Sequence, residues 1–185
     1  MDTKPIHTTG DAGSAELARA ETAPPLAVPA ALLGTYRVEE TLGAGAMGVV
    51  YRATHRGRDR PVAIKLPTLT DTAHVERFIR EGRLLSRLEH PNLVRVYDYG
   101  TSDELSYYTC EYLTGSDLFA ATRELEFEGL YDVVRQALEA LGFIHDRGLV
   151  HYDVKPENLN VLVLPPATPG ARPSFQVKLV DFGLT

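Results

Sequence analysis

The side chains that could do chemistry are concentrated in one short run, residues 151–158, with the sequence HYDVKPEN. Asp153 can accept the proton of an attacking hydroxyl, Lys155 can stabilise charge on a transferred phosphoryl group, and Asn158 can ligate Mg²⁺. Phosphoryl transfer needs little covalent chemistry from a protein, but it needs strict positioning and charge neutralisation. Asp181, in a later Asp-Phe-Gly tripeptide, would bind Mg²⁺ across the phosphates. The alternative for residues 151–158 alone is a polar loop after a helix.

A second candidate pair consists of Lys65 and Glu81. Lys65 ends the strand-like run VAIK, from which its ammonium could reach the α- and β-phosphates of a nucleotide if an acid holds it in place. Glu81 lies on a predicted helix and is the candidate partner. A lone Lys or Glu is usually a solvated surface charge. The position of this pair after a Gly-rich hairpin favours the functional interpretation.

The Gly-rich hairpin contains Gly43, Gly45 and Gly48 in a G-x-G-x-x-G pattern, which also describes the dinucleotide-binding turn. That turn joins a strand to a helix and has an acidic residue roughly 20 positions later. Here the pattern lies between two strand-like runs and Val50 follows, which favours a β-hairpin lid over phosphates. Glycine suits such a lid because a Cβ would keep the backbone amides away from the phosphate oxygens. On the motif alone, a turn without a ligand remains open.

Hydrophobic periodicity predicts the elements that position these residues. Strands are expected at residues 36–42, 49–54, 61–66, 93–99 and 105–111. Between the third and fourth strands, apolar residues at 3.6-residue spacing predict a helix capped by Asp71 or Thr72. The expected order is therefore β-β-β-α-β-β.

After residue 115 the pattern becomes helical. The apolar stripe of the predicted long helix consists of Leu130, Val133, Val134, Ala137, Leu138, Leu141 and Ile144. This helix is expected to end near Arg147, with Gly148 at the C′ position. A Pro-rich loop at residues 165–173 and a strand at 176–180 follow.

Composition limits the classes of function. A net charge of -6 gives no general attraction to nucleic acid or anionic lipid, so any phosphate binding must be local. The single cysteine, Cys110, excludes an internal disulfide and indicates a reducing compartment. The N-terminus lacks an apolar run of signal-peptide length, and no apolar stretch is long enough to span a membrane. A cytoplasmic protein is expected.

The first 34 residues differ from the rest because they are rich in Ala, Thr and Pro and contain no aromatic residue. Such a segment buries too little apolar surface to offset its conformational entropy. We therefore expect a disordered tail at residues 1–34, with a short helix as an option around residues 15–21. A linker is favoured over a recruitment segment.

Taken together, the four motifs resemble the eukaryotic-type (Hanks-type) protein kinases. The resemblance runs from about Tyr36 to the last residue, and the Gly-rich hairpin is especially similar to bacterial members of the family. Lys155, two positions after Asp153, is the serine/threonine form. The resemblance implies an α+β, protein-kinase-like fold. It divides the chain into an ATP-binding N-lobe at residues 35–113, a five-stranded antiparallel sheet with one helix, and a partial, mainly helical C-lobe at residues 114–185.

The resemblance also implies site roles. The residues implied to bind the nucleotide are Leu42, Gly43, Gly45, Gly48, Val50, Ala63, Lys65, Glu111, Leu113 and Asp117. The implied catalytic set is Asp153, Lys155, Lys65 and Glu81, with Asn158 and Asp181 as metal ligands. Glu111 and Leu113 fall on the hinge beside the adenine edge, Asp117 would reach the ribose, and Cys110 falls at the gatekeeper position. Leu85, Val96, His151 and Phe182 match an apolar column that stacks in the assembled enzyme.

The sequence departs from the family pattern at several points. Tyr152 replaces the usual arginine that pairs with an activation-loop phosphate, which argues against control by such phosphorylation. Asn160 occupies the position of the aliphatic floor beneath the adenine, unless Leu159 is turned inward instead. No activation segment follows Thr185, so a fragment is expected. The helix from about Leu130 should then expose an apolar patch.

The resemblance implies a serine/threonine protein kinase that uses ATP and Mg²⁺ to phosphorylate Ser or Thr of protein substrates, without nucleic-acid partners or a membrane span. The main alternative is a catalytically inactive, ATP-binding or scaffolding kinase fragment. A small-molecule phosphotransferase of kinase-like fold shares the Asp and Asn chemistry, but the sequences KPE at residues 155–157 and HPN at 90–92 disfavour it.

Overall fold

The structure, a computed structural model, describes residues 30–45, 48–68, 71–102, 105–121, 126–166, 168 and 172–182. The predicted tail up to residue 29, with the optional helix at 15–21, lies outside the described residues. Gly183, the last residue of the Asp-Phe-Gly tripeptide, also lies outside them. Among the described helices, none combines the length and apolar character that a membrane crossing requires.

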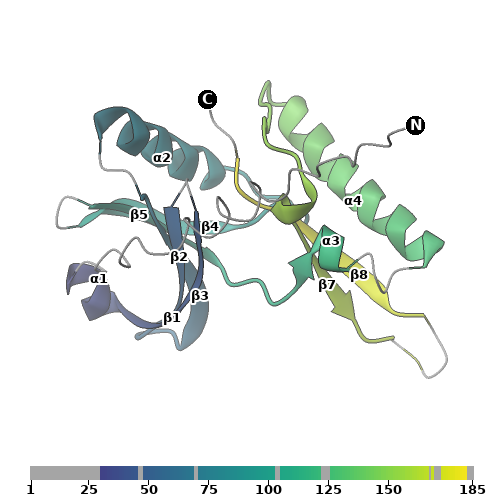
Figure 1. Ribbon diagram of the computed structural model, residues 1–185, viewed down its shortest axis with the longest axis horizontal. Coiled ribbons are helices and arrows are strands. Elements are labelled where there is room, and N and C mark those ends of the chain that lie inside the picture. The colour runs from purple at the N-terminus through teal and green to yellow at the C-terminus, as the bar shows by residue number, and fades with distance from the viewer. Residues whose placement is uncertain are drawn as a thin grey trace, which may run out of the picture.

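The N-lobe is a five-stranded antiparallel sheet in the order β1-β2-β3-β5-β4 (Figure 1). Its strands are β1 (Tyr36–Gly45), β2 (Gly48–His55), β3 (Arg60–Leu66), β4 (Val96–Ser102) and β5 (Leu105–Glu111), with α2 (Thr72–Leu85) between β3 and β4. The predicted order β-β-β-α-β-β is confirmed. The fourth strand was predicted to begin at residue 93 but begins at Val96, because Val94 N–H donates to Leu179 O in the other lobe at 3.0 Å.

Strand alternation gives the N-lobe sheet two different faces. Val62, Ile64 and Leu66 of β3 are buried in an apolar cluster on the outer face, together with Leu32 of helix α1 (Ala30–Thr35). Residues 30–34 were assigned to the disordered tail, and for these residues the assignment is wrong because Leu32 is buried in this cluster. Ala63 and Lys65 point to the opposite face, toward the cavity between the lobes.

Helix α2 begins with Asp71 as its N-cap, since the Asp71 side chain accepts a hydrogen bond from His74 N–H. This satisfies one of the backbone donors that the first turn of a helix leaves free. Phe78, Gly82 and Leu85 are buried with Glu81 on the face that packs against β4 and β5. The amphipathic pattern of α2 therefore brings Glu81 to the sheet as predicted.

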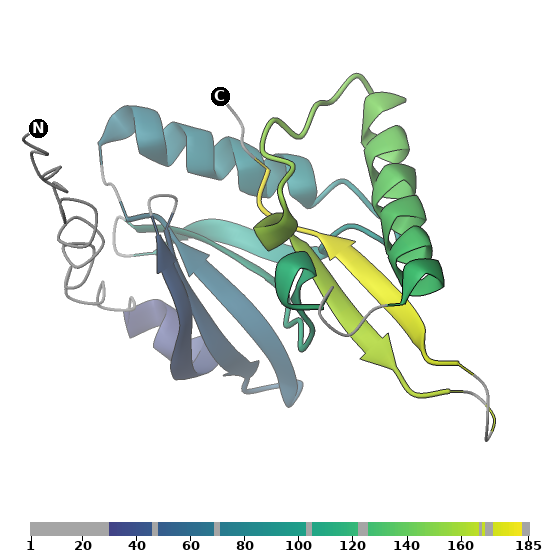
Figure 2. The same cartoon turned by 45° about the vertical axis from the view of Figure 1, so that its right-hand side comes forward.

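The second lobe combines helices with a small sheet (Figure 2). The helical elements are α3 (Leu118–Ala121), α4 (Phe127–His145) and the 3-10 turn η2 (Pro156–Asn158), and the strands are β6 (Ser116–Asp117), β7 (Leu159–Leu164) and β8 (Ser174–Leu179). These strands pair in the order β6-β7-β8. The predicted final strand, 176–180, corresponds to β8. β6, β7 and α3 were not predicted.

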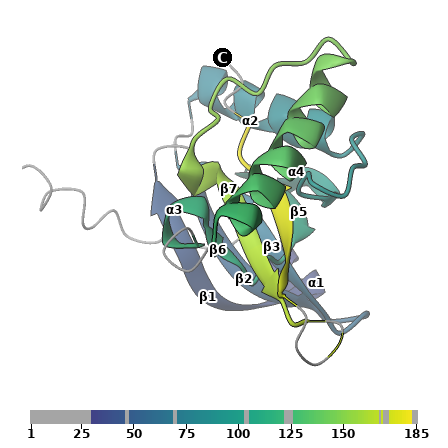
Figure 3. The same ribbon diagram turned by 90° about the vertical axis from the view of Figure 1, so that its right-hand side faces the viewer.

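Helix α4 lies along the three-stranded sheet and packs mainly on β8 (Figure 3). Gly148 follows its C-terminus with φ +71°, the left-handed conformation expected for a glycine at a helix end. Only part of the predicted stripe packs inward. Leu130, Val134 and Leu138 are 37%, 44% and 60% exposed, so the expected apolar patch is present.

The connection between α2 and β4 is joined to the second lobe by buried polar groups. Asn92 Nδ2 donates to Gln136 Oε1 on α4 at 2.7 Å and to Val177 O on β8 at 2.9 Å. Val177 N–H in turn donates to Gln136 Oε1 at 3.0 Å. Buried polar groups are tolerated when their hydrogen bonds are made inside the protein. The connection thus fixes β8, and the segment that follows it, relative to the N-lobe.

Candidate active site

A cavity of about 430 Å³ lies between the two lobes, within the usual size range of small-molecule sites. Eight of the ten residues predicted to bind the nucleotide line it: Leu42, Gly43, Val50, Ala63, Lys65, Glu111, Leu113 and Asp117. Asp181 and Cys110 line it as well. Gly45 and Gly48 do not line it, but they are paired with each other at the tip of the β1–β2 hairpin.

Three charged groups, from β3, α2 and the segment after β8, meet beside this cavity, and two of them, Lys65 and Asp181, line it. Lys65 Nζ lies 2.7 Å from Asp181 Oδ1 and 3.5 Å from Glu81 Oε1, and Lys65 and Glu81 are both buried. Burial opposes the charge on Lys65, but the carboxylates of Glu81 and Asp181 outweigh it, so the pKa of Lys65 lies above its usual value. The ammonium is therefore held charged where phosphate oxygens could be bound.

Glu81 has a second partner that the sequence did not indicate. The Tyr108 hydroxyl donates to Glu81 Oε1 at 3.0 Å, and the buried Tyr108 ring stacks on Phe78 with a centroid separation of 5.1 Å. Burial raises the pKa of Glu81, while Lys65 and the Tyr108 hydrogen bond oppose this shift. Tyr108 thus orients the acid that orients Lys65.

The loop before η2 holds the second group of candidates. Asn158 Nδ2 donates to both the backbone oxygen and Oδ2 of Asp153, each at 2.9 Å. Lys155 Nζ lies 2.9 Å from the same Asp153 Oδ2, and the hydrogen bond from Lys155 lowers the pKa of Asp153. Asp153 is therefore held as a carboxylate, which is the form that can accept a proton.

His151 connects this loop to the segment that carries Asp181. Burial lowers the pKa of His151, which favours a neutral ring. In that form Nε2–H donates to Val180 O at 3.0 Å, and Nδ1 accepts from Asp153 N–H at 3.3 Å. The His151 ring also lies 4.5 Å from the ring of Phe182 between centroids. Asp153 and Asp181 are consequently positioned by one side chain.

The members of the predicted apolar column are all buried. Leu85, Val96 and Phe182 belong to a single apolar cluster, and His151 contacts it through Phe182. Tyr152, where the resemblance implies an arginine, is exposed and adopts φ +63°. Its backbone conformation turns the chain between His151 and Asp153.

The glycines of the β1–β2 hairpin meet different constraints. A Cβ on Gly48, whose φ is +146°, would lie 2.3 Å from Leu66 O, so the fold itself requires glycine there. A Cβ on Gly43 or Gly45 would meet no described atom within 4 Å. Glycine at these two positions is thus not explained by the packing of the described residues, and a ligand that approaches the backbone would explain it.

The register of β7 determines which of its side chains, Leu159 or Asn160, faces the cavity. Asn160 lines the cavity, and Leu159 is buried in the apolar core instead. The alternative register, with Leu159 turned into the cavity, is therefore wrong. A polar amide at this position is costly to cover with an apolar surface unless it finds a partner.

Sequence reasoning missed four further residues that line the cavity: Val94, Tyr108, Glu157 and Val180. Tyr108 lies two residues before Cys110, so strand alternation could have indicated it. Val180 directly precedes Asp181, so its proximity to the Asp-Phe-Gly motif was the available signal. Val94 gave no such signal, because its position depends on the contact between the α2–β4 connection and β8.

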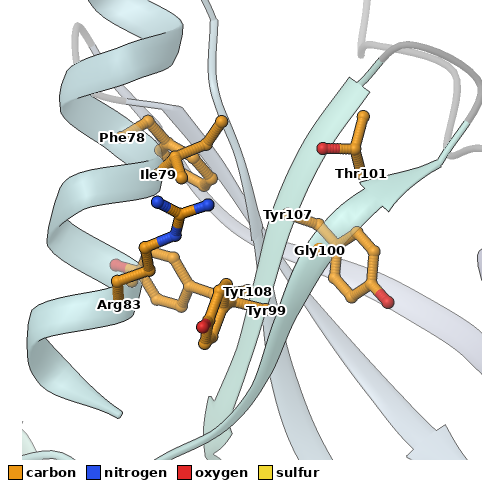
Figure 4. A pocket seen from close by; sticks show the side chains of 9 residues that line it. Phe78, Ile79, Arg83, Tyr99, Gly100, Thr101, Tyr107 and Tyr108 are labelled. Carbon is orange, nitrogen blue, oxygen red and sulfur yellow. The ribbon is translucent and has the colours of Figure 1, made fainter. Parts of the chain in front are cut away.

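A smaller hollow of about 80 Å³ lies between α2 and strands β4 and β5 (Figure 4). Aromatic side chains, among them Phe78, Tyr99 and Tyr107, form its walls together with Arg83. It contains none of the candidate catalytic residues, whereas Lys65 and Asp181 line the interlobe cavity. The interlobe cavity is therefore the candidate active site.

A magnesium site would have to be built from few protein ligands. Among the described residues, no group of three or more His, Cys, Asp and Glu side chains could hold a metal. Asn158 uses its amide nitrogen on Asp153, which leaves its amide oxygen for another partner. That oxygen and the Asp181 carboxylate are hard ligands of the kind Mg²⁺ prefers when phosphates supply the rest, so the residues fit this metal.

Comparison with known proteins identifies the family of this chain. Residues 36–185 match the family model described as protein kinase domain, and the chain belongs to this family. Among curated proteins, the serine/threonine-protein kinase pkn3 of Myxococcus xanthus is 39% identical over 156 residues, which cover 80% of this chain and 27% of the relative. The human calcium/calmodulin-dependent protein kinase type IV is 37% identical, over 84% of this chain and 32% of the relative.

Solved structures show the same fold. The kinase domain of PknI from Mycobacterium tuberculosis has a TM-score of 0.64 and 31% identity, covering 85% of this chain and 62% of that one. Rad53 in complex with AMP-PNP has a TM-score of 0.66 and 28% identity, covering 83% and 40%. The predicted fold class and the relationship to bacterial kinases are thus confirmed. The chain spans about a third or less of the curated relatives named above.

Proposed function

We propose that this chain carries the nucleotide-binding and phosphoryl-transfer groups of a serine/threonine protein kinase, which transfers the γ-phosphate of ATP to Ser or Thr hydroxyls of protein substrates. One observation carries the proposal: Lys65 and Asp181 meet in a nucleotide-sized cavity, and the buried Glu81 pairs with Lys65 behind it. His151 holds the Asp153 loop beside the same segment.

Each end of the cavity has a distinct task. The hinge residues Glu111 and Leu113 would bind the adenine edge, and Asp117 would bind the ribose, since all three line the cavity. Lys65 would bind the α- and β-phosphates. Asn158 would hold Mg²⁺ together with Asp181, and the ion would neutralise charge that develops on the transferred group.

The transfer step would use the loop at residues 151–158. Asp153 is kept ionised and would take the proton of the attacking hydroxyl, while Lys155 would move from Asp153 to the transferred phosphoryl group. Lys155 two positions after Asp153 supports a serine/threonine substrate, and the pkn3 relative bears that name. We further propose the nucleotide contacts and domain boundaries given above as parts of this function.

A nucleotide titration tests the first half of the proposal. Mg-ATP should raise the melting temperature of this chain, and Lys65→Met should abolish most of the rise because the phosphates lose their buried cation. Asp181→Asn should reduce the rise mainly when Mg²⁺ is present. Asp59→Asn, in the exposed β2–β3 turn, is the matched control and should behave as the unchanged chain.

Phosphorylation of a generic protein substrate tests the second half, in a chain extended through the rest of the kinase domain. Both Lys65→Met and Asp181→Asn should eliminate the phosphorylation. A chain that binds Mg-ATP yet transfers nothing after this extension would support the inactive, scaffolding alternative. Unchanged transfer in both variants would refute the assigned roles.

A further inference from the structure

Lys178 on β8 makes a mostly buried ion pair across the lobe boundary. Its Nζ lies 2.7 Å from Glu111 Oε1 at the end of β5, and the two side chains are only 13% and 21% exposed. The same Nζ donates to Leu93 O at 3.2 Å in the α2–β4 connection. One ammonium thus joins β8, the hinge and the segment that precedes β4.

The acid at the hinge is held from a second direction. Arg95 N–H donates to Glu111 Oε1 at 2.8 Å, and Glu111 N–H donates to Arg95 O at 2.9 Å. The segment before Arg95 is itself bound to β8, since Leu179 N–H donates to Asn92 O at 2.8 Å. Every hydrogen bond described for the Glu111 carboxylate therefore leads to β8 or to a segment fixed on it.

The direction of β8 gives this ion pair its significance. Lys178 lies three residues before Asp181, and both Glu111 and Asp181 line the same cavity, Glu111 at the hinge and Asp181 beside Lys65. Strand β8, which leads to Asp181 at the phosphate end of the cavity, therefore also binds the hinge at the adenine end through Lys178. Lys178 itself is not among the residues that line the cavity.

We propose that Lys178 is a positioning residue that holds the adenine end and the phosphate end of the nucleotide site at a fixed separation. The proposal rests on the proposed function, because it assumes that the cavity binds Mg-ATP. A ligand that touches both ends gains affinity only when the two ends are held at the right separation. A ligand that touches one end gains nothing from that separation.

This difference defines the expected result. Lys178→Met removes the cation but keeps the length of the apolar stem. It should weaken Mg-ATP about fivefold, the upper range for an ion pair of this exposure. Adenosine, which reaches only the base and ribose end, should bind with unchanged affinity. Lys178→Arg keeps the cation and its donors and should restore most of the Mg-ATP affinity.

The experiment measures both affinities by competition against a fluorescent ATP analogue, well below the melting temperature of each variant. Arg135→Met is the control, since it removes a cation from an ion-paired group on α4 outside the cavity. Glu111→Gln removes the same ion pair from the other side and should weaken Mg-ATP to a similar extent. The double variant should be no weaker than the more affected single variant.

The outcomes separate this inference from the proposed function. If the unchanged chain does not bind Mg-ATP, the proposed function fails. If it binds, equal loss of ATP and adenosine affinity in Lys178→Met, or no loss of either, overturns the positioning role. Additive losses in the double variant also overturn it, and so does a lower melting temperature with both affinities unchanged. If Lys178→Met does not fold, the same reading applies to Lys178→Gln.

Discussion

The hydroxyl of Tyr108 offers a sharp test of how the buried Lys65 site is stabilised. Tyr108→Phe deletes the donor that lies 3.0 Å from Glu81 Oε1 and keeps the aromatic ring that stacks on Phe78. Among the described residues, Glu81 then retains Lys65, at 3.5 Å, as its charged partner. The substitution therefore isolates one hydrogen bond to a buried carboxylate.

Leaving a buried acceptor without its donor costs about 1–3 kcal/mol. Because Lys65 remains and compensates part of the loss, we expect the free energy of unfolding to fall by about 1.5 kcal/mol. For a chain of this length that loss corresponds to a melting temperature lower by about 3–6 °C. Mg-ATP affinity should also fall, since Glu81 would hold Lys65 less firmly.

The effect should depend on pH with a definite sign. Burial raises the pKa of Glu81 in the folded chain, so folding is disfavoured progressively as pH rises from the ordinary carboxyl pKa through the folded pKa. The Tyr108 hydrogen bond opposes that shift. Its removal raises the pKa further, so the destabilisation by Tyr108→Phe should be larger at pH 8 than at pH 5.

Urea denaturation at these two pH values measures the effect. Tyr99→Phe is the control, because Tyr99 lies on the neighbouring strand β4 and is 40% exposed, in contrast to the buried Tyr108. In a Glu81→Gln background, the cost of Tyr108→Phe should shrink. The reasoning would be refuted by equal losses for the two tyrosines, or by a loss that does not change with pH.

Three further predictions concern the cavity. Gly48→Ala should lower the free energy of unfolding, measured in urea, by about 2 kcal/mol or more, because position 48 has a positive φ and a Cβ there would meet the β3 backbone. Gly45→Ala should change the free energy of unfolding by no more than about 0.5 kcal/mol and should weaken Mg-ATP binding instead. Asn160→Val should strengthen Mg-ATP binding roughly threefold in a calorimetric titration, since an apolar floor replaces an amide that must be desolvated; weaker binding would show that the amide bonds the nucleotide. In an NMR titration, the pKa of Asp153 should lie below its ordinary value and rise in Lys155→Met. A depressed pKa means that Asp153 stabilises the fold above its ordinary pKa and loses that contribution as pH falls through the folded pKa.

The sequence predicted the elements whose signals are local. Alternation placed four N-lobe strands within a few residues. The residue types offered Asp71 or Thr72 as the cap, of which Asp71 is the observed one, and they also placed the left-handed Gly148. The pairing of Lys65 with Glu81 was predicted from their positions, since Lys65 ends a strand-like run after the Gly-rich hairpin and Glu81 lies on the helix that follows. In the structure, Lys65 Nζ lies 3.5 Å from Glu81 Oε1.

The remaining features depend on contacts between distant residues. β4 starts late because Val94 bonds to β8 instead, and α1 is ordered through the burial of Leu32 in the outer-face cluster. β6 and α3 have two and four residues, too few to show a period. Lys178 and Tyr108 received no role from the sequence, because nothing local indicates which acid each one meets.

The attachment of the α2–β4 connection to β8 has a consequence for how the chain folds. Asn92 and Leu93 bond to Val177 and Lys178, partners that lie 85 residues later in the chain. Closing a loop of that length costs entropy before any contact is gained, and contacts of high sequence separation slow folding. During synthesis the N-lobe strands can pair early. Asn92 and Leu93 in the α2–β4 connection cannot form their hydrogen bonds to β8 until β8 has been synthesised. Because these contacts form late, Asn92→Ala should lower stability mainly by speeding unfolding, with little change in the refolding rate.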